Sequence, residues 1–290
     1  MTMIEQVRRF NRTVTSRIGA LDGHFLGRNR SLGACRVLFE IGADGAEIRD
    51  LRVRLGLDSG YMSRLLRSLE AEGLVRTDRA PDDARVRYAV LTPAGRREVA
   101  LLNRLSDKAA AALLEPLSGK QRMALTSAME AVERLLLASA VRVEVENPAS
   151  PAAQRCLAQY FDELAARFDA GFEPARSISA SIAELTPPHG FFVVAWLNGE
   201  AIGCGALKCQ PTHGEIKRMW VAGSSRGLGV GKRILQRLEE LARQRRLRLL
   251  RLETNKALTE AHALYRSSGY REVAAFNDEP YAHHWFEKRL

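Results

Sequence analysis

The sequence predicts two domains, one mainly α-helical and one α/β with a mixed, largely antiparallel sheet. The chain has 290 residues, of which 46% are hydrophobic, and this is enough for two cores of ordinary size. At residue 141 the hydrophobic period changes from helical to alternating, with valines separated by polar residues. Further along, a glycine-rich loop at residues 226–231 separates a strand pattern from a helix pattern. We therefore expect one domain over residues 1–139 and another over residues 140–290.

Composition narrows the classes of protein. The formal net charge of +10 suits a partner that carries phosphates. The four cysteines show no CxxC spacing, so neither a disulfide framework nor a structural zinc site is indicated, and no metal is expected. Because the sequence has no continuous apolar segment at its start and no run of eighteen apolar residues, we expect a cytoplasmic protein without membrane contact.

Helical patterns dominate the first half. Apolar residues at steps of three and four predict one long helix over residues 4–25, and further helices follow at 31–42 and 46–56. A fourth helix is expected from Asp58 or Ser59, available as N-cap, to Gly73 as its stop. The face of this helix opposite its apolar residues carries short polar and basic side chains near the N-terminus, which is what a DNA recognition helix needs to reach base edges.

A hairpin and two long helices complete this half. Strand patterns at 74–79 and 85–92 are joined by a turn containing Pro and Asp, and helices are expected from 93 to 114 and from 118 to 138. This order predicts a winged helix-turn-helix with an added dimerisation arm. Arginines on the hairpin could enter a minor groove, or could be ordinary solvated charges.

Residues 82–95, DDARVRYAVLTPAG, resemble the wing signature of the MarR family of regulators, and the order of helices is similar over residues 1–139. The matching residues are Asp83, Arg85, Leu91, Thr92 and Gly95. The resemblance implies a homodimer, held by the terminal helices, that binds an inverted-repeat operator in double-stranded DNA. It also implies the DNA-binding residues, which are Ser59, Tyr61, Ser63, Arg64 and Arg67 on the recognition helix, with Asp83 positioning Arg85 at the wing tip.

The second half alternates strands and helices. Expected strands lie at 141–146, 191–197, 200–209, 215–221, 247–254, 270–276 and 282–290, and expected helices begin at Ser150-Pro151, after the glycine loop and at residue 260. Asn198-Gly199 predicts a type I′ hairpin between the second and third strands.

The loop RGLGVG has the geometry of a phosphate site. Backbone N–H groups can converge on a phosphate only where no Cβ blocks them, and the first turn of a helix adds a favourable dipole. Neither the GxxxxGK[ST] loop of nucleotide triphosphatases nor a dinucleotide-binding GxGxxG in a parallel unit is present. The loop therefore predicts a phosphate-bearing ligand of another kind.

Arg226, Gly229 and Gly231 form an RxxGxG string that resembles motif A of the GNAT acetyltransferases, and the likeness extends over residues 141–290. The resemblance implies that acetyl-CoA is the co-substrate, with its pyrophosphate on residues 226–231 and its pantetheine arm along the strand before them. The implied coenzyme contacts are Met219, Trp220, Val221, Arg226, Gly227, Leu228, Gly229, Val230, Gly231, Lys232, Asn255 and Tyr265.

Acetyl transfer to an amine needs a base, because an amine with a pKa near 10.4 must lose a proton before it attacks. Glu215, at the start of the strand leading to the loop, is the candidate base; the alternative is a strand-edge charge without a role. The resemblance implies Tyr265 as proton donor to the departing thiolate and the Met219 N–H as donor to the oxyanion, although Tyr265 could be a core residue.

These patterns predict a bifunctional transcriptional regulator and acetyl-CoA-dependent N-acetyltransferase that acts on a primary amine. Two alternatives stay open: a transcription factor whose second half senses acetyl-CoA without turnover, and an enzyme whose first half serves only dimerisation and protein contacts. The acceptor is not identified by the sequence, and its specificity is expected to depend on residues 168–189 and on the loop at 276–281.

Overall fold

The computed structural model describes residues 1–79, 86–169, 171–178 and 180–290. Within them the chain divides into two compact units, Met1–Ala128 and Met129–Leu290. This division falls inside helix α6 (Gly119–Ala140), upstream of the boundary expected between residues 139 and 140. The position of that boundary stays a prediction.

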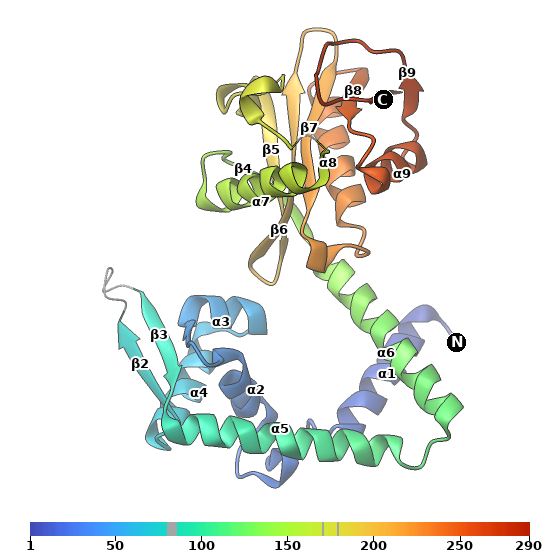
Figure 1. Cartoon of the computed structure of the whole chain (residues 1–290). Helices are drawn as coiled ribbons and strands as arrows, with labels where there is room; N and C mark the ends of the chain where they lie inside the picture. Colours follow the sequence, from blue (N-terminus) through green and yellow to red (C-terminus); the bar gives the residue numbers. More distant parts are fainter. Residues whose placement is uncertain (80–85, 170, 179) are drawn as a thin grey trace. The chain divides into compact units, whose positions relative to one another are not determined.

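The first unit is mainly helical and carries a small sheet (Figure 1). Before the start of α6 its elements are α1 (Met3–Arg17), η1 (Phe25–Gly27), α2 (Leu32–Ile41), β1 (Ala46–Glu47), α3 (Ile48–Leu55), α4 (Ser59–Ala71), β2 (Val75–Arg79), β3 (Arg87–Leu91) and α5 (Pro93–Leu114). The strands pair antiparallel in the order β1-β3-β2. Three helices, a hairpin and the start of α5 share one core that includes the fully buried Leu38, Leu51 and Leu69, so the predicted winged helix-turn-helix is confirmed.

The first helix is shorter than predicted. Helix α1 ends at Arg17, whereas the apolar period had indicated a helix over residues 4–25. Gly19 has a φ of +66° and lies directly after the C-cap Ile18, so the chain leaves the helix through a left-handed residue. The periodic apolar residues beyond that point therefore lie in turns and in η1, and the spacing alone could not reveal the break.

Gly95, a residue of the wing signature, is required by packing. A Cβ at this position would collide with the carbonyl oxygen of Leu74. Thr92, the N-cap of α5, accepts a hydrogen bond from the Gly95 N–H at 3.0 Å. The close approach fixes the start of α5 against the end of α4.

The second unit is built on a seven-stranded sheet in the order β4-β5-β6-β7-β8-β10-β9. The strands are β4 (Arg142–Glu146), β5 (Gly190–Leu197), β6 (Glu200–Cys209), β7 (Gly214–Val221), β8 (Leu249–Thr254), β9 (Arg271–Val273) and β10 (His284–Arg289), and the helices are α7 (Pro151–Arg167), η2 (Pro174–Arg176), η3 (Ala183–Leu185), η4 (Gly223–Ser225), α8 (Val230–Gln244) and α9 (Thr259–Ser267). Neighbouring strands pair antiparallel except β7 and β8. The mixed, largely antiparallel sheet is thus confirmed.

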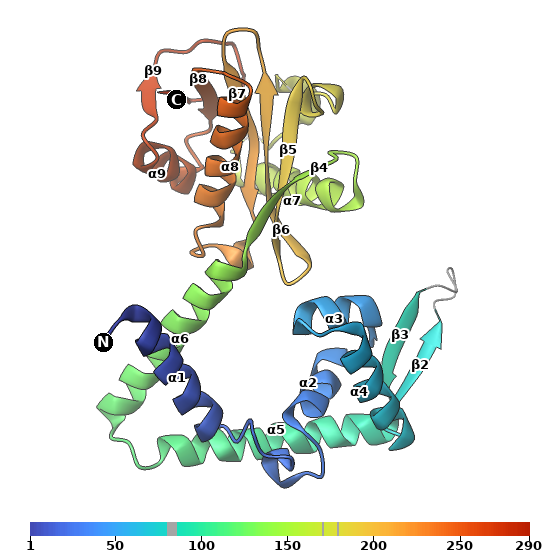
Figure 2. The ribbon, with the colours of Figure 1, turned by 180° about the vertical axis from the view of Figure 1, so that it is seen from behind.

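Helices cover both faces of this sheet (Figures 1 and 2). Val193 and Ala195 of β5 pack in the cluster that contains α8, whereas Phe192 and Val194 pack in the cluster that contains α7. Because successive side chains of a strand point to opposite faces, a strand with both faces covered is hydrophobic throughout. This explains the unbroken apolar run GFFVVAWL.

Strand β7 pairs with β8 over only a short stretch. Its parallel register with β8 covers two residue pairs, Gly214 with Leu250 and Glu215 with Arg251. Beyond them β7 carries a bulge, in which Arg218 and the next residue lie opposite Gly205 alone and Arg218 has a φ of +55°. The two strands therefore diverge toward their carboxyl ends, and side chains from both reach into the gap.

Candidate active site

The glycine loop leads directly into helix α8. Gly227 and Gly229 have φ values of +82° and +74°, which favour glycine, and a Cβ at either position would meet open space. Gly229 is the N-cap, so the amides of the first helical turn have no intrahelical acceptor and point out of the helix start. Gly231 differs, because a Cβ there would press against Leu264 of α9 at 3.3 Å.

A groove runs past this loop between β7, α7 and α9. Most of the predicted coenzyme contacts line it, namely Met219, Trp220, Val221, Arg226, Gly227, Gly229, Val230, Gly231, Lys232 and Tyr265. Leu228 does not line the groove and packs against the core beneath α8. Asn255 lies in a neighbouring pocket, where its side chain donates to the Tyr281 carbonyl at 2.7 Å and accepts from the Ala257 N–H at 2.9 Å.

Four charged side chains line the same groove and bind one another. Arg226 donates to both carboxylate oxygens of Glu163 at 2.6 Å, and Arg167 bridges Glu163 and Glu260. Burial by itself would raise the pKa of Glu163, but the hydrogen bonds from Arg226 and Arg167 outweigh it and lower the pKa. The hydrogen bond from Arg167 lowers the pKa of Glu260 to about 2. The network balances its own charge, which leaves the backbone amides and the exposed Lys232 as the positive groups facing the groove.

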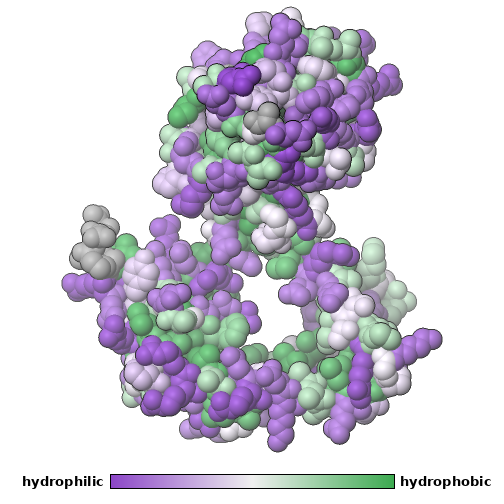
Figure 3. Space-filling view, viewed as in Figure 1, coloured by the Kyte–Doolittle hydropathy of each residue, from purple (hydrophilic) through white to green (hydrophobic). Residues whose placement is uncertain are grey.

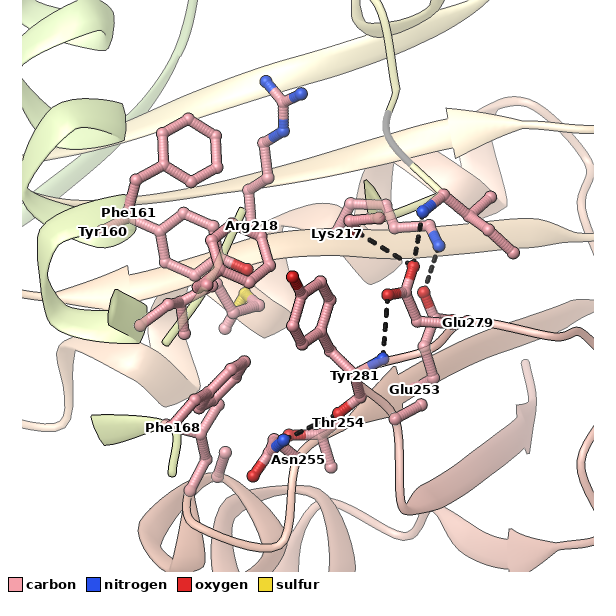
Figure 4. A pocket seen from close by; sticks show the side chains of 18 of the residues that line it. Tyr160, Phe161, Phe168, Lys217, Arg218, Glu253, Thr254, Asn255, Glu279 and Tyr281 are labelled. Atoms are coloured by element: carbon pink, nitrogen blue, oxygen red, sulfur yellow. Dashed lines mark hydrogen bonds and ion pairs between the residues drawn. The ribbon is translucent and has the colours of Figure 1, made fainter. Parts of the chain in front are cut away.

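A second pocket adjoins the groove (Figure 4). Its wall combines aromatic residues from α7, the segment after it, α9 and the loop before β10 with charged residues from β7, β8 and that same loop. The aromatic members are Tyr160, Phe161, Phe168, Phe172, Tyr265 and Tyr281, and the charged members are Lys217, Arg218, Glu253 and Glu279. Residues from both segments that the sequence singled out for specificity, 168–189 and 276–281, line this pocket.

The two pockets meet around Met219 and Tyr265, which line both. Tyr265 is buried, and burial raises its pKa well above the usual value. A phenol with a raised pKa keeps its proton at neutral pH, and this suits a proton donor. The predicted catalytic pair of Tyr265 and Met219 thus lies at the junction between the groove and the second pocket.

Glu215 lies outside the lining of both pockets. Its carboxylate accepts from Gln210 Nε2 at 3.0 Å and lies 3.6 Å from Lys217 Nζ. Lys217 in turn forms a close ion pair with Glu253, whose side chain is 8% exposed and lines the second pocket. Glu215 therefore reaches the pocket through Lys217, while Glu253 reaches it directly.

Glu253 is a functional candidate that sequence reasoning missed. It belongs to LRLET, a strand whose alternate leucines are buried, and a charged residue there gives no local sign of a site. The one available signal was its place at the carboxyl end of the strand beside β7, which only the sheet order reveals.

Helix α4 presents the residues predicted to contact DNA. Asp58 caps it, accepting from the Tyr61 N–H at 2.8 Å, and Ser59, Ser63, Arg64 and Arg67 are exposed. Tyr61 is half-buried and packs against the core, and Arg64 lies over its ring at 5.6 Å. Asp83 and Arg85 lie outside the described residues.

The acetyltransferase (GNAT) family model matches residues 153–270. The protein named IAA acetyltransferase from Azospirillum brasilense is 35% identical over 126 residues, which cover 42% of this chain and 82% of that protein. This chain belongs to the GNAT acetyltransferase family. The uncharacterized N-acetyltransferase YsnE of Bacillus subtilis is 39% identical over 109 residues, or 36% of this chain and 72% of that protein. A GNAT acetyltransferase from Staphylococcus aureus has a TM-score of 0.45 at 16% identity, covering 52% of this chain and 99% of that one.

The MarR family model matches residues 26–86. The chain therefore joins a MarR-family region to a GNAT domain, and the GNAT domain is an acetyl-CoA-dependent N-acetyltransferase. Across the described parts of the chain, no group of three or more His, Cys, Asp or Glu side chains could hold a metal ion. No helix in those parts has the length and hydrophobicity needed to cross a bilayer.

Proposed function

We propose that the chain is a bifunctional transcriptional regulator and N-acetyltransferase that moves acetyl from acetyl-CoA to a small primary amine. The observation that carries this proposal is the junction at Met219 and Tyr265, where a groove beside the glycine loop meets a separate pocket that contains a buried carboxylate. Acetyl-CoA supplies an activated acetyl group as a thioester. The groove suits its pyrophosphate and pantetheine arm, and the pocket suits the acceptor.

The residues at this junction divide the work of acetyl transfer. The amides at the start of α8 bind the pyrophosphate, and the groove directs the thioester toward Met219. A carboxylate takes a proton from the amine, the Met219 N–H stabilises the oxyanion, and Tyr265 protonates the departing thiolate. Glu215 stays the predicted base, and Glu253 joins it as the carboxylate that lines the pocket.

The direct test uses the purified full-length chain with acetyl-CoA and a panel of small amines, following CoA release and the mass of the products. Time-dependent acetylation of at least one amine supports the proposal. Saturable acetyl-CoA binding without any product, together with operator affinity that changes with acetyl-CoA, would instead indicate a sensor.

Binding to double-stranded DNA through α4 is the second half of the proposal. We expect Arg64→Ala to weaken binding about 10-fold to 100-fold, because an arginine near the start of a recognition helix reaches base edges or phosphates. The measurement is a titration of duplexes selected from a random pool by the full-length protein, at fixed salt. Arg104→Ala, which removes an exposed arginine on α5, is the charge-matched control. Equal affinities for wild type and Arg64→Ala would remove α4 from the interface.

A homodimer held by the terminal helices would cover apolar side chains that are exposed on the first unit (Figure 3). Ile4 of α1 is 73% exposed and Met123 of α6 is 67% exposed, and neither helix contains a buried residue. We expect Ile4→Glu to raise the dimer dissociation constant roughly 100-fold, because each interface would then bury an unpaired carboxylate.

Analytical ultracentrifugation of the full-length chain would measure this shift. Gln6→Glu adds the same charge to the same helix at a polar position and is the matched control. A wild-type chain that sediments as a monomer, or equal shifts for both variants, would contradict dimerisation through α1.

A further inference from the structure

Five aromatic side chains form a continuous cluster on one side of the second pocket. Phe161 stacks on Phe172 with ring centroids 5.9 Å apart, and Phe172 lies 4.8 Å from Tyr281. Phe168 contacts Phe172 and Tyr281 at 5.8 Å, and Tyr160 lies 5.3 Å from Phe161. All five are partly exposed and line the pocket. Such a wall favours a planar apolar group, because aromatic pairs gain energy beyond the area that they bury.

Lys217, Glu253 and Glu279 lie close together in this pocket (Figure 4), whereas Arg218 lies over the Phe161 ring at 5.7 Å. Glu253 pairs with Lys217 through Oε1, whereas Oε2 is buried and, among the described residues, accepts no hydrogen bond. A buried carboxylate oxygen without a donor is costly, and a substrate N–H would satisfy it. Of the carboxylate oxygens of Glu253 and Glu279, it is the one without a donor among the described residues, and a substrate amine would supply that donor.

Glu279 does not offer a second site for a cation. One of its oxygens accepts from Ser177 Oγ at 2.9 Å and the Ile178 N–H at 2.6 Å, and the other accepts from the Tyr281 N–H at 3.2 Å. These bonds tie the segment after α7 to the loop before β10. A ligand with several separated ammonium groups would find one open carboxylate oxygen, so the pocket fits a single amine.

We propose that the acceptor is a small primary monoamine with an aromatic body, which stacks on the cluster of Phe161, Phe172 and Tyr281 while its nitrogen lies against Glu253 Oε2. This inference rests on the proposed transferase function and deepens it. The bound ammonium loses one proton to Glu253, and its nitrogen pair then forms a bond to the thioester carbonyl carbon. As the C–S bond breaks, the thiolate takes a proton from Tyr265, and the second nitrogen proton restores the Tyr265 phenol. Glu253 then releases its proton to solvent. The products are the N-acetyl amine, CoA and one released proton.

The test measures kcat/KM of the full-length chain for three acceptors: 2-phenylethylamine, n-butylamine and spermidine. We expect 2-phenylethylamine to exceed n-butylamine about 100-fold, from burial of the ring and its contacts with the aromatic wall. Binding of acetyl-CoA is measured separately by calorimetry. If spermidine or n-butylamine reacts as well as 2-phenylethylamine, the aromatic acceptor is excluded and the transferase function stands. If none of the three amines is acetylated while another amine of the panel is, this inference fails alone. If acetyl-CoA binds and no amine of the panel is acetylated, the transferase function fails together with it.

A pair of variants tests whether the aromatic cluster binds the ring of the acceptor. Phe172→Leu keeps an apolar side chain but removes a ring from the cluster, and we expect it to raise KM for 2-phenylethylamine about 10-fold while kcat changes little. Phe276→Leu is the matched control, because Phe276 is an aromatic residue of the same unit that lies under Arg251 and lines neither pocket. Equal effects of the two variants on KM would overturn the proposed stacking.

Discussion

Glu253→Gln should lower kcat/KM for the amine about 100-fold to 1000-fold without weakening acetyl-CoA binding. The glutamine keeps the size of the side chain, but it cannot accept the proton that the amine must lose. Steady-state kinetics with the best acceptor would measure kcat/KM, and calorimetry would measure the binding of acetyl-CoA.

Glu215→Gln distinguishes the role of Glu215 from that of Glu253. Glu215 lies 3.6 Å from Lys217 and does not line the pocket, so in this arrangement it positions Lys217 and Glu253. We expect a smaller loss of kcat/KM, about 10-fold. If Glu215→Gln lowers kcat/KM more than Glu253→Gln does, Glu215 is the base, as the sequence analysis predicted.

Gly229→Ala should weaken acetyl-CoA binding about 10-fold to 100-fold, which corresponds to the loss of one or two charge-assisted hydrogen bonds. Gly229 has a φ of +74°, and a Cβ makes this conformation unfavourable. Relaxation of the strain would rotate the amides at the start of α8 away from the pyrophosphate. Isothermal titration of the full-length chain with acetyl-CoA would measure the change in affinity.

Gly223→Ala is the matched control for this loop. Gly223 lies a few residues earlier, has open space around a Cβ, has no positive φ and does not line the groove. We expect its affinity for acetyl-CoA to equal that of the wild type. Similar losses of acetyl-CoA affinity in both alanine variants would show that a side chain anywhere in this loop weakens binding. The specific role of Gly229 and of the amides that follow it would then be contradicted.

Much of this protein could be predicted from short stretches of sequence. Asp58 and Ser150 were expected as helix caps, and each accepts a backbone hydrogen bond in the structure. Asn198 and Gly199 both have positive φ, as a type I′ turn requires. The predicted length of α1 was wrong for a reason that is also local. One glycine can end a helix without disturbing the apolar spacing around it.

The groove was also within reach of sequence reasoning, since its glycines, the strand before them and the helix after them are contiguous in the chain. The second pocket was not. Glu253 and Tyr281 come from separate elements, and they meet Phe161 only after β7 and β8 diverge and the segment after α7 folds against the loop before β10.

The sequence by itself therefore determined the two families, the order of the elements and the glycine loop, because caps, turns and periodicity act between residues that are close in the chain. Only the tertiary structure decided which carboxylates and which rings line the second pocket. Those relations depend on the order of strands in the sheet, on a bulge at Arg218 and on contacts between residues about a hundred positions apart, and no local pattern records them.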